Sequence, residues 1–431
     1  MHGRLQSSLA VHLEIINTGA ELMLGRVLNT HQQWLCRQLA DAGYVVTRQV
    51  AVDDSGPAIL EAVRAALTAA DILITTGGLG PTSDDRTRDL IAELLGRPLH
   101  EDASVLERIQ NFFSQRHRQM PASTRVQAMI PAGATVLQNE LGTAPGLVME
   151  VKAMRSGNKR EITLLVMLPG PPRELWPMFT AQVLPIIRER FPLEVPFVCR
   201  TLKTTGLGES VLEEKIAGAL HSLTDAGMEL GYCARVGEVD VRFVARGAGA
   251  GESVEAAERI VRERIGNSVF GVDDDSLEAA VLRLLTERRQ TLALAESCTG
   301  GFIAHRLTNI PGASAVFLAG LVTYRNEAKQ QFLGVRPATL AEHGAVSEPT
   351  AREMAEGARQ RTGADFALAV TGIAGPTGGS EAKPVGTVFL GLATAEKTVV
   401  RRHLNPYDRE TFKYVTSQQA LDLLRRALLE K

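Results

Sequence analysis

Short apolar strands that run into a glycine-containing turn and then a helix constrain the fold of this chain most. The clearest spans residues 71–76, a mostly apolar run that stops at Gly77-Gly78. Residues 162–168 and 291–295 repeat the pattern. Strands of this kind are buried on both faces, as in parallel sheets covered by helices. The pattern therefore predicts an α/β fold with layered helices.

The spacing of these strands divides the chain. Its 431 residues suffice for several domains of about 100–200 residues each. Strands and helices alternate over 13–180, which predicts a doubly wound α/β domain. Residues 181–272 predict a small α+β connector, and the alternation restarts over 273–431. Residues 1–12 are predicted to be an N-terminal tail.

Composition excludes several functional classes. Lys+Arg 47 against Asp+Glu 49 leaves a net charge of −2, so no basic excess is present to bind nucleic acid. No apolar run reaches the roughly 20 residues of a membrane span, and the first residues lack the apolar core of a signal peptide. We expect a cytoplasmic protein with no nucleic-acid or membrane partner. The cysteines are scattered without a CxxC pair, which fits a reducing compartment: Cys36, Cys199, Cys233 and Cys298.

The first candidate site is the turn after residues 71–76. Gly77, Gly78 and Gly80 lie between a buried strand and a helix start, where backbone N–H groups form a cradle for phosphate. The turn lacks the Gly-Lys-Ser/Thr of a P-loop and the Gly-x-Gly-x-x-Gly of a dinucleotide site.

Two carboxylates, Asp84 and Asp85, follow this turn. They repel a phosphate unless a divalent cation lies between them, and Mg²⁺ binds in that way. The alternative is that the glycines only make a tight turn and that Asp84 caps the next helix.

Further polar groups follow other strand ends. The loops 139–146 and 168–174 are rich in turn formers, and Glu21 lies just after the first strand. Together with the turn after residues 71–76 they make three such loops, which is more than reversing the chain direction requires. The three loops therefore predict one shared crevice. For Glu21, an ordinary solvated residue is an equally good interpretation.

Residues 77–87, 139–146 and 168–174 resemble the N-terminal domain of CinA proteins, which is similar to the molybdopterin-binding fold of MoaB and Mog proteins. The resemblance implies a nucleotide-type pocket. In the CinA branch it implies a metal-dependent pyrophosphatase acting on ADP-ribose, with Asp84 and Asp85 as metal ligands. Binding of a molybdopterin precursor stays open as an alternative. The implied ligand contacts are Gly77, Gly78, Gly80, Thr82, Asn139 and Thr143.

The second candidate site is the turn 296–301 after the strand 291–295. N–H groups and a hydroxyl at a helix start suit one phosphate. Cys298 is favoured as a small buried filler, because no adjacent histidine activates it. His305 lies two helical turns on, so a nucleophilic role of Cys298 also stays open.

Ser314, Tyr324 and Lys329 form a second set of reactive groups. A serine can act with a neutral lysine as base, because burial lowers the pKa of lysine. Tyr324 can orient the pair. Taken from the residues alone, ordinary surface positions are the better interpretation.

The segments 295–301, 323–329, 344–349 and 371–379 resemble the C-terminal CinA domain, a nicotinamide mononucleotide deamidase. The resemblance implies Ser314 as nucleophile, Lys329 as general base and Tyr324 as its partner, with no cofactor. The implied walls of the substrate pocket are Thr299, Gly300, Gly301, Gly372 and Gly375.

Asp408-Arg409 matches a pair in this family, and Arg409 suits a substrate phosphate. The family usually has glycine before the pair, whereas Tyr407 stands here, which puts the shape of this loop in question. The alternative is a capping Asp408 beside an exposed arginine.

The middle module corresponds to a KH-like insert. KH domains bind RNA with a Gly-x-x-Gly loop and basic neighbours, but Gly206-Leu207-Gly208-Glu209 is not basic. We therefore expect a spacer or dimer element, and the resemblance implies a homodimer.

The prediction from sequence is a pyridine-nucleotide recycling hydrolase that acts on small-molecule nucleotides. Its C-terminal domain forms nicotinate mononucleotide and ammonia, and its N-terminal domain cleaves ADP-ribose with a divalent metal. A non-enzymatic role in competence or DNA damage, which the family name suggests, is a further alternative.

Overall fold

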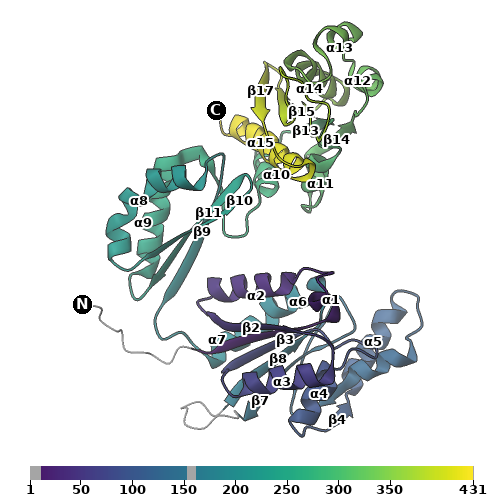
Figure 1. Cartoon of the computed structure of the whole chain (residues 1–431), viewed down its shortest axis with the longest axis vertical. Coiled ribbons are helices and arrows are strands. Elements are labelled where there is room, and N and C mark those ends of the chain that lie inside the picture. Colours follow the sequence, from purple (N-terminus) through teal and green to yellow (C-terminus); the bar gives the residue numbers. More distant parts are fainter. Residues whose placement is uncertain (1–10, 153–161, 431) are drawn as a thin grey trace. The chain divides into compact units, whose positions relative to one another are not determined.

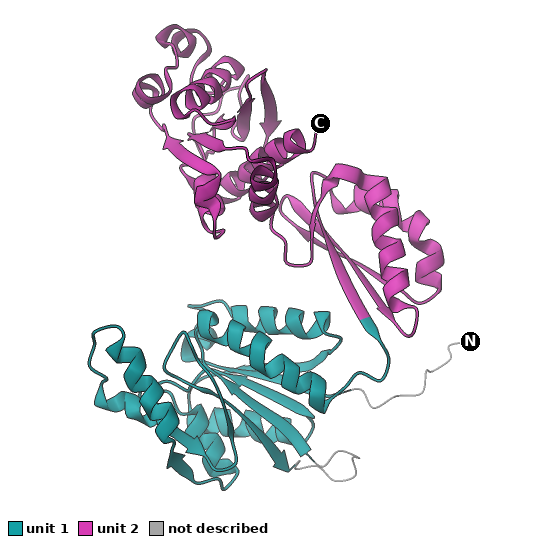
Figure 2. Ribbon diagram, turned by 180° about the vertical axis from the view of Figure 1, so that it is seen from behind, with its two compact units in different colours: residues 1–197 teal, residues 198–431 magenta. Residues whose placement is uncertain are grey.

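The computed structural model describes residues 11–152 and 162–430, so residues 1–10 of the predicted tail lie outside it. The chain forms two compact units, residues 1–197 and residues 198–431 (Figure 2).

The first unit is built on a six-stranded sheet with the order β2-β1-β3-β8-β7-β6. The four strands β2, β1, β3 and β8 are parallel, whereas β7 pairs antiparallel with β8, and β6 pairs antiparallel with β7. The α/β fold predicted from sequence is confirmed. The strands are β1 (Leu13–Thr18), β2 (Val46–Val52), β3 (Ile72–Thr76), β6 (Thr135–Leu137), β7 (Gly146–Lys152) and β8 (Ile162–Leu168).

Helices cover both faces of this sheet (Figure 1). One apolar layer contains Leu35, Leu175 and Ile187, and the other contains Val63, Ile91 and Ile109. The first layer is formed by α2 (Thr30–Asp41), α6 (Pro172–Met178) and α7 (Leu184–Arg190), the second by α3 (Gly56–Leu67), α4 (Thr87–Leu94) and α5 (Ala103–Ser114).

Strict strand–helix alternation does not persist to residue 180 as we expected. After α4, the strand β4 (Leu99–Glu101) pairs with β5 (Met129–Pro131) in a separate two-stranded ribbon. The helix α7 continues the unit beyond residue 180, because Ile187 and Phe191 are buried in its core. A short helix α1 (Ala20–Met23) follows β1.

The turn after β3 requires glycine. Gly77 has φ 95°, and a Cβ atom there would lie 2.7 Å from the carbonyl oxygen of Thr18. Side chains cannot occupy this position, so the backbone of β3 passes close to the end of β1.

The second unit begins with the connector. Its four-stranded sheet has the order β10-β11-β9-β12. Apolar residues of α8 and α9, including Leu212, Ile216 and Val261, form its core with the strands. The elements are β9 (Phe197–Thr205), α8 (Glu209–Asp225), β10 (Glu229–Arg235), β11 (Glu238–Arg246), α9 (Ala250–Ile265) and β12 (Val269–Val272).

A five-stranded sheet with the order β14-β13-β15-β16-β17 forms the rest of this unit. The strands β14, β13 and β15 are parallel, and β16 and β17 are antiparallel additions. The strands are β13 (Leu292–Glu296), β14 (Phe317–Val322), β15 (Phe366–Gly372), β16 (Thr387–Ala393) and β17 (Thr398–Leu404).

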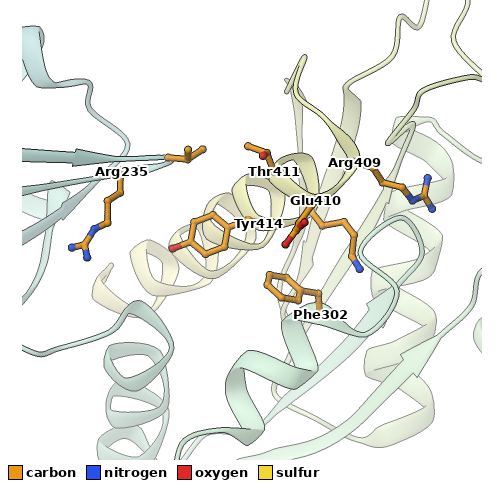
Figure 3. Close-up of a pocket in the computed structure, with 8 residues that line it drawn as sticks. Arg235, Phe302, Arg409, Glu410, Thr411 and Tyr414 are labelled. Atoms are coloured by element: carbon orange, nitrogen blue, oxygen red, sulfur yellow. The ribbon is translucent and has the colours of Figure 1, made fainter. Parts of the chain in front are cut away.

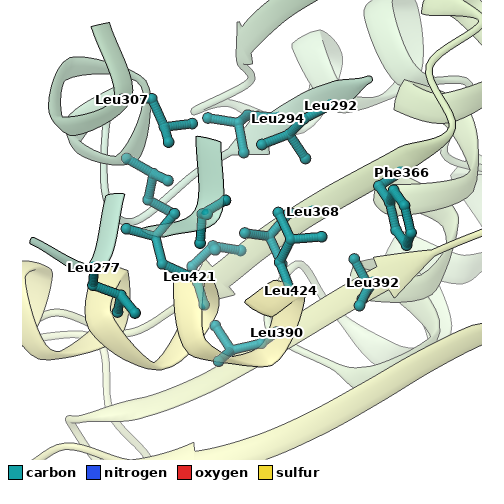
Figure 4. Packing of buried hydrophobic residues seen from close by; sticks show 14 of the residues in the cluster. Leu277, Leu292, Leu294, Leu307, Phe366, Leu368, Leu390, Leu392, Leu421 and Leu424 are labelled. Atoms are coloured by element: carbon teal, nitrogen blue, oxygen red, sulfur yellow. The ribbon is translucent and has the colours of Figure 1, made fainter. Parts of the chain in front are cut away.

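Helices again cover both faces. Figure 4 shows one layer, in which Leu277 and Leu421 pack against Leu294 and Leu368 of the sheet. The opposite layer contains Leu333, Leu340 and Met354. The helices are α10 (Leu277–Arg288), α11 (Phe302–Thr308), α12 (Asn326–Leu333), α13 (Pro337–His343), α14 (Glu348–Thr362) and α15 (Arg409–Leu429).

The connector is joined to α15 by polar contacts. Arg425 is 2% exposed, pairs with Asp422 at 2.6 Å and donates to the carbonyl oxygen of Val269 at 3.4 Å. Across residues 11–152 and 162–430, the structure contains no helix with the length and apolar character of a membrane span.

Candidate functional site

A polar cavity of about 400 Å³ lies at the carboxyl ends of β1, β3 and β8. It brings together most of the residues predicted for the first site. Predicted members that line it are Gly77, Gly78, Gly80, Asp84, Asp85 and Thr143. The adjoining loop 168–174 contributes Pro169, Gly170 and Glu174, and Glu21 also lines the cavity.

Sequence reasoning missed Asp54 and Gln127, which line the same cavity. Gln127 is 2% exposed, and its Oε1 has no hydrogen-bond partner in the described chain. The signal for Asp54 is its position just after β2, whose carboxyl end lies beside that of β1.

Negative charge accumulates in this cavity. Burial raises the pKa of Asp54, and the charges of Glu21, Asp84 and Asp85 raise it further. The hydrogen bond that Asp54 accepts from the N–H of Ala20 at 2.7 Å acts in the opposite direction and lowers this pKa. By contrast, the nearby side chain of Thr82 lowers the pKa of the exposed Asp84. The arrangement favours binding of a cation.

The residues of this cavity fit a hard divalent cation in the type of their ligand atoms but not in the number that are arranged around one point. Every candidate ligand is a carboxylate or amide oxygen, as Mg²⁺ prefers. Nevertheless, no group of three or more His, Cys, Asp or Glu in the described residues is arranged to hold a metal ion. The residues therefore fit a cation that completes its shell with ligand oxygens, and Asp84 and Asp54 are among the carboxylates of the cavity that could contact it.

Thr82, Asp85 and Asn139 have structural partners. The N–H of Thr82 donates to Asp85 Oδ2 at 3.0 Å, which stabilises the turn. Asn139 donates to the carbonyl oxygen of Ala144 at 2.7 Å and to Glu174 Oε2 at 2.8 Å. Thr82 and Asn139 do not line the 400 Å³ cavity. In this structure both residues shape the loops around it.

The centre of the second site is Lys329 on α12, which is 1% exposed. Its Nζ lies 3.0 Å from Ser297 Oγ, 2.8 Å from the carbonyl oxygen of Thr323 and 3.1 Å from that of Tyr324. Burial lowers the pKa of Lys329. A neutral amine has two hydrogens for the carbonyls and a lone pair for the Ser297 hydroxyl.

The two serines of this site differ in position. Ser297, at 8% exposed, contacts Lys329, whereas Ser314 lies in an exposed 3₁₀ turn over Ala313–Ala315. Among the described residues, Lys329 has no hydrogen bond with Ser314. Sequence reasoning passed over Ser297 as the partner of Lys329, because 32 positions separate them.

The turn 296–301 does not offer the free helix N-terminus that we expected for a phosphate. Glu296 is 1% exposed and accepts the N–H groups of Gly301 at 3.0 Å, Ile303 at 3.1 Å and Ala304 at 2.9 Å. A carboxylate of the chain itself thus occupies the place of an anion at α11.

Thr299 and Gly300 differ in exposure. Thr299 is fully buried, and its hydroxyl has no partner in the described chain. Gly300 is exposed, with its N–H bonded to the carbonyl oxygen of Ser297 at 3.1 Å.

Cys298 behaves as the buried filler that the sequence favoured. It is 5% exposed, and burial raises the pKa of its thiol to about 12. His305 stacks on Phe302 and contacts Asn309. Because Cys298 remains a thiol at neutral pH, it is a poor nucleophile.

Arg409 links two predicted residues of the second site. Its Nη2 donates to the hydroxyl of Tyr324 at 2.6 Å and its Nη1 donates to the carbonyl oxygen of Gly375 at 3.0 Å. Asp408 caps α15 by accepting the N–H groups of Glu410 and Thr411. The structure therefore joins the strand end, the loop after β15 and the start of α15.

Gly372 is the last residue of β15 and packs closely against β16. A Cβ atom there would lie 2.9 Å from the carbonyl oxygen of Thr387 on β16. This close approach explains the glycine without a ligand.

A cavity of about 880 Å³ lies between α15, Phe302 and the connector residues Arg235 and Val236 (Figure 3). Lys329, Ser297 and Ser314 do not line it. In Figure 3 the Arg409 side chain extends away from Tyr414, which agrees with its contacts to Tyr324 and Gly375. We therefore place the reactive groups outside this cavity.

Comparison with protein families assigns all three parts of the chain. Residues 14–189 match the "Probable molybdopterin binding domain" family, residues 199–271 the "Damage-inducible protein CinA KH domain", and residues 274–428 the "CinA C-terminal domain".

Full-length relatives are similar over nearly the whole chain. A CinA-like protein of Akkermansia muciniphila is 45% identical over 95% of this chain and 96% of its own length. A Moorella thermoacetica protein, named for competence and damage induction, is 45% identical over 96% of this chain and 98% of its own.

Solved structures cover part of the chain. The competence/damage inducible protein CihA of Agrobacterium tumefaciens is 45% identical, with a TM-score of 0.34. The match covers 36% of this chain and 94% of that protein.

Proposed function

Because the chain belongs to the CinA family, we propose that its C-terminal part, residues 273–431, hydrolyses the carboxamide of nicotinamide mononucleotide. The observation that supports this most is the contact of buried Lys329 with Ser297 at 3.0 Å. A lysine whose pKa is lowered by burial can accept a proton from a serine hydroxyl near neutral pH.

The proposed reaction has two steps. The serine oxygen attacks the carboxamide carbon, its proton passes to Lys329, and the C–N bond breaks as ammonia leaves with that proton. Water then cleaves the serine ester and releases nicotinate mononucleotide. Tyr324 positions Lys329 in this proposal. Its hydroxyl accepts a hydrogen bond from Arg409 at 2.6 Å, and its backbone carbonyl oxygen accepts one from Lys329 Nζ.

Two serines compete for the nucleophilic role. The family resemblance implies Ser314, whereas the contact with Lys329 favours Ser297. The test is ammonia release from nicotinamide mononucleotide by S297A and S314A, followed by trapping of the acyl-enzyme in each. The serine whose alanine variant alone forms no ester is the nucleophile. Ester formation in both variants excludes both serines, and absence of an ester in the unsubstituted chain contradicts the covalent mechanism.

For the N-terminal domain we propose cleavage of ADP-ribose to AMP and ribose 5-phosphate. The supporting observation is the 400 Å³ cavity in which a glycine turn and carboxylates meet. A divalent cation bound by Asp84 and Asp54 would neutralise the diphosphate and polarise its phosphoryl oxygens. The chain itself supplies the turn with Gly77, Gly78 and Gly80, which lines this cavity.

Binding of a molybdopterin precursor is the second candidate for this domain, since the family match over 14–189 carries that description. Thermal shifts with a pterin and with ADP-ribose plus Mg²⁺ separate the two. Stabilisation by ADP-ribose alone supports hydrolysis, and stabilisation by the pterin alone contradicts it. Absence of turnover in both domains favours a non-enzymatic role.

We also propose a cytoplasmic homodimer. Sedimentation of the purified chain tests the dimer, and a single species at the 46.5 kDa monomer mass contradicts it.

A further inference from the structure

A second polar cavity of the N-terminal unit lies between α5 and the loop 139–145, with a volume of about 280 Å³. Arg108, Asn111 and Gln115 line it from one side. Their spacing of three and four residues places them on one face of the helix and its continuation. Neither reaction proposed above uses this face.

Arg108 is an incompletely satisfied cation. It is partly buried, and in the described ranges its guanidinium has neither an ion pair nor a hydrogen bond. Burial lowers the pKa of Arg108, and the charge of Asp102 raises it by a smaller amount. Asp102 itself accepts the N–H groups of Ser104 and Val105 at the start of α5.

The neighbouring Arg116 shows what a satisfied arginine looks like in this cavity. Its Nη1 donates to the carbonyl oxygen of Phe112 at 3.0 Å, and its guanidinium lies 3.6 Å from the centre of the Phe112 ring. Desolvated cations are normally paired. Arg108 therefore lacks an anionic partner that a ligand can supply.

The two cavities of this unit share a wall. Thr143 lines both, and Asn139, which lines the second, donates to Glu174 of the first at 2.8 Å. Among the described residues, the first cavity is lined by five carboxylates and no arginine or lysine, whereas the second is lined by two arginines, Arg108 and Arg116, and one carboxylate, Glu140. A diphosphate joins its two phosphates through one oxygen, so it can lie across a single residue such as Thr143.

We propose that the α5 cavity binds the second phosphate of a diphosphate-containing nucleotide whose first phosphate lies at the Gly77–Gly80 turn. Arg108 is the cation that selects diphosphates over monophosphates. The class of ligand rests on the function proposed for the N-terminal domain, whereas the subsite rests on the cavity and the unpaired arginine.

Calorimetric titration of the full chain with ADP and with AMP, in the presence of Mg²⁺, tests this subsite. Loss of one charge-assisted, two-donor contact in R108Q is expected to weaken ADP binding about 10–100-fold. AMP binding is expected to change less than about twofold. The control R118Q removes an exposed arginine that lines neither cavity and should bind both ligands as the unsubstituted chain does.

Equal ADP affinity of R108Q and R118Q, an equal loss for AMP and ADP, or no ADP binding to the unsubstituted chain overturns the subsite. ADP-ribose hydrolysis is measured in parallel. Its absence together with Arg108-dependent ADP binding overturns the proposed reaction and leaves the subsite.

If R108Q does not fold, R108K carries the test, because it keeps the charge but loses the two-donor fork. A several-fold loss for ADP alone supports the subsite, and unchanged ADP affinity contradicts it.

Discussion

Two glycine-rich turns of this chain follow the same local pattern but differ in the surroundings of the turn. Each follows a buried parallel strand, β3 in the first unit and β13 in the second. After β3, the turn opens into a cavity lined by Asp54 and Asp84. After β13, Glu296 turns back and accepts three N–H groups around α11. The difference shows that an anion site at a helix start depends on whether the chain already supplies the anion.

The electrostatics of the two sites differ in the same way. Carboxylates accumulate in the first site and favour binding of a cation. The second site contains Lys329, whose pKa is lowered by burial, so its neutral form is favoured. We therefore expect metal dependence in the first site and pH dependence in the second.

The largest expected effect is in K329M, which removes the base of the second site. Loss of a general base lowers the rate about 10²–10⁴-fold. Ammonia release from nicotinamide mononucleotide measures this loss, with K397M, at a lysine in the turn between β16 and β17, as the control. Equal rates in the two variants would remove Lys329 from the mechanism.

In the first site, D84N is expected to lower metal-dependent ADP-ribose cleavage by about 10–100-fold, the range for impaired metal coordination. AMP formation at several Mg²⁺ concentrations is the measurement. D53N is a matched control, since Asp53 bonds to Ser55 and does not line the cavity. An unchanged Mg²⁺ dependence in D84N is incompatible with its role as a ligand.

The deamidase rate should rise with pH as Lys329 loses its proton and level off above its lowered pKa. Stability should rise with pH over the interval from that pKa to the ordinary lysine value, because the unfolded chain binds more protons there. Rates and unfolding midpoints measured across this interval check both trends. A rate that falls with rising pH contradicts a neutral lysine base.

The smallest effect is expected in E296Q, which weakens the cap of α11. Hydrogen bonds to a charged group contribute about 1.5–3 kcal/mol, and each kcal/mol shifts the melting temperature by about 2–4 °C in a domain of 150–250 residues. Differential scanning calorimetry measures the shift. The exposed Glu327, at 77% side-chain exposure, supplies the control E327Q, which should melt like the unsubstituted chain. Equal melting temperatures of E296Q and E327Q would contradict the capping role of Glu296.

Much of the fold was predictable because apolar runs report buried strands directly. Residues 162–168 form β8 with the bounds that we expected. The strand β14 ends at Val322, so Tyr324 lies beyond it, and the carbonyl oxygen of Tyr324 accepts a hydrogen bond from Lys329. The helix α12 was not expected, since its apolar pattern is weak and its main buried group is a lysine.

The candidate sites were predictable only where one segment carries the chemistry. The turn Gly77–Gly80 and Asp84 are contiguous and line one cavity. By contrast, Asp54 follows β2, and the pairing of Ser297 with Lys329 joins the turn after β13 to the helix α12. The role of Glu296 depends on the direction of its side chain, which periodicity does not encode.

The central claim is that one chain carries two independent hydrolytic centres, one that needs a cation and one that uses a lysine. A single measurement tests it most directly: both substrates are given to the full chain with and without EDTA, and AMP and ammonia are measured together. The account predicts that EDTA abolishes AMP formation and leaves ammonia release unchanged. Loss of both products, or persistence of AMP formation in EDTA, would contradict it.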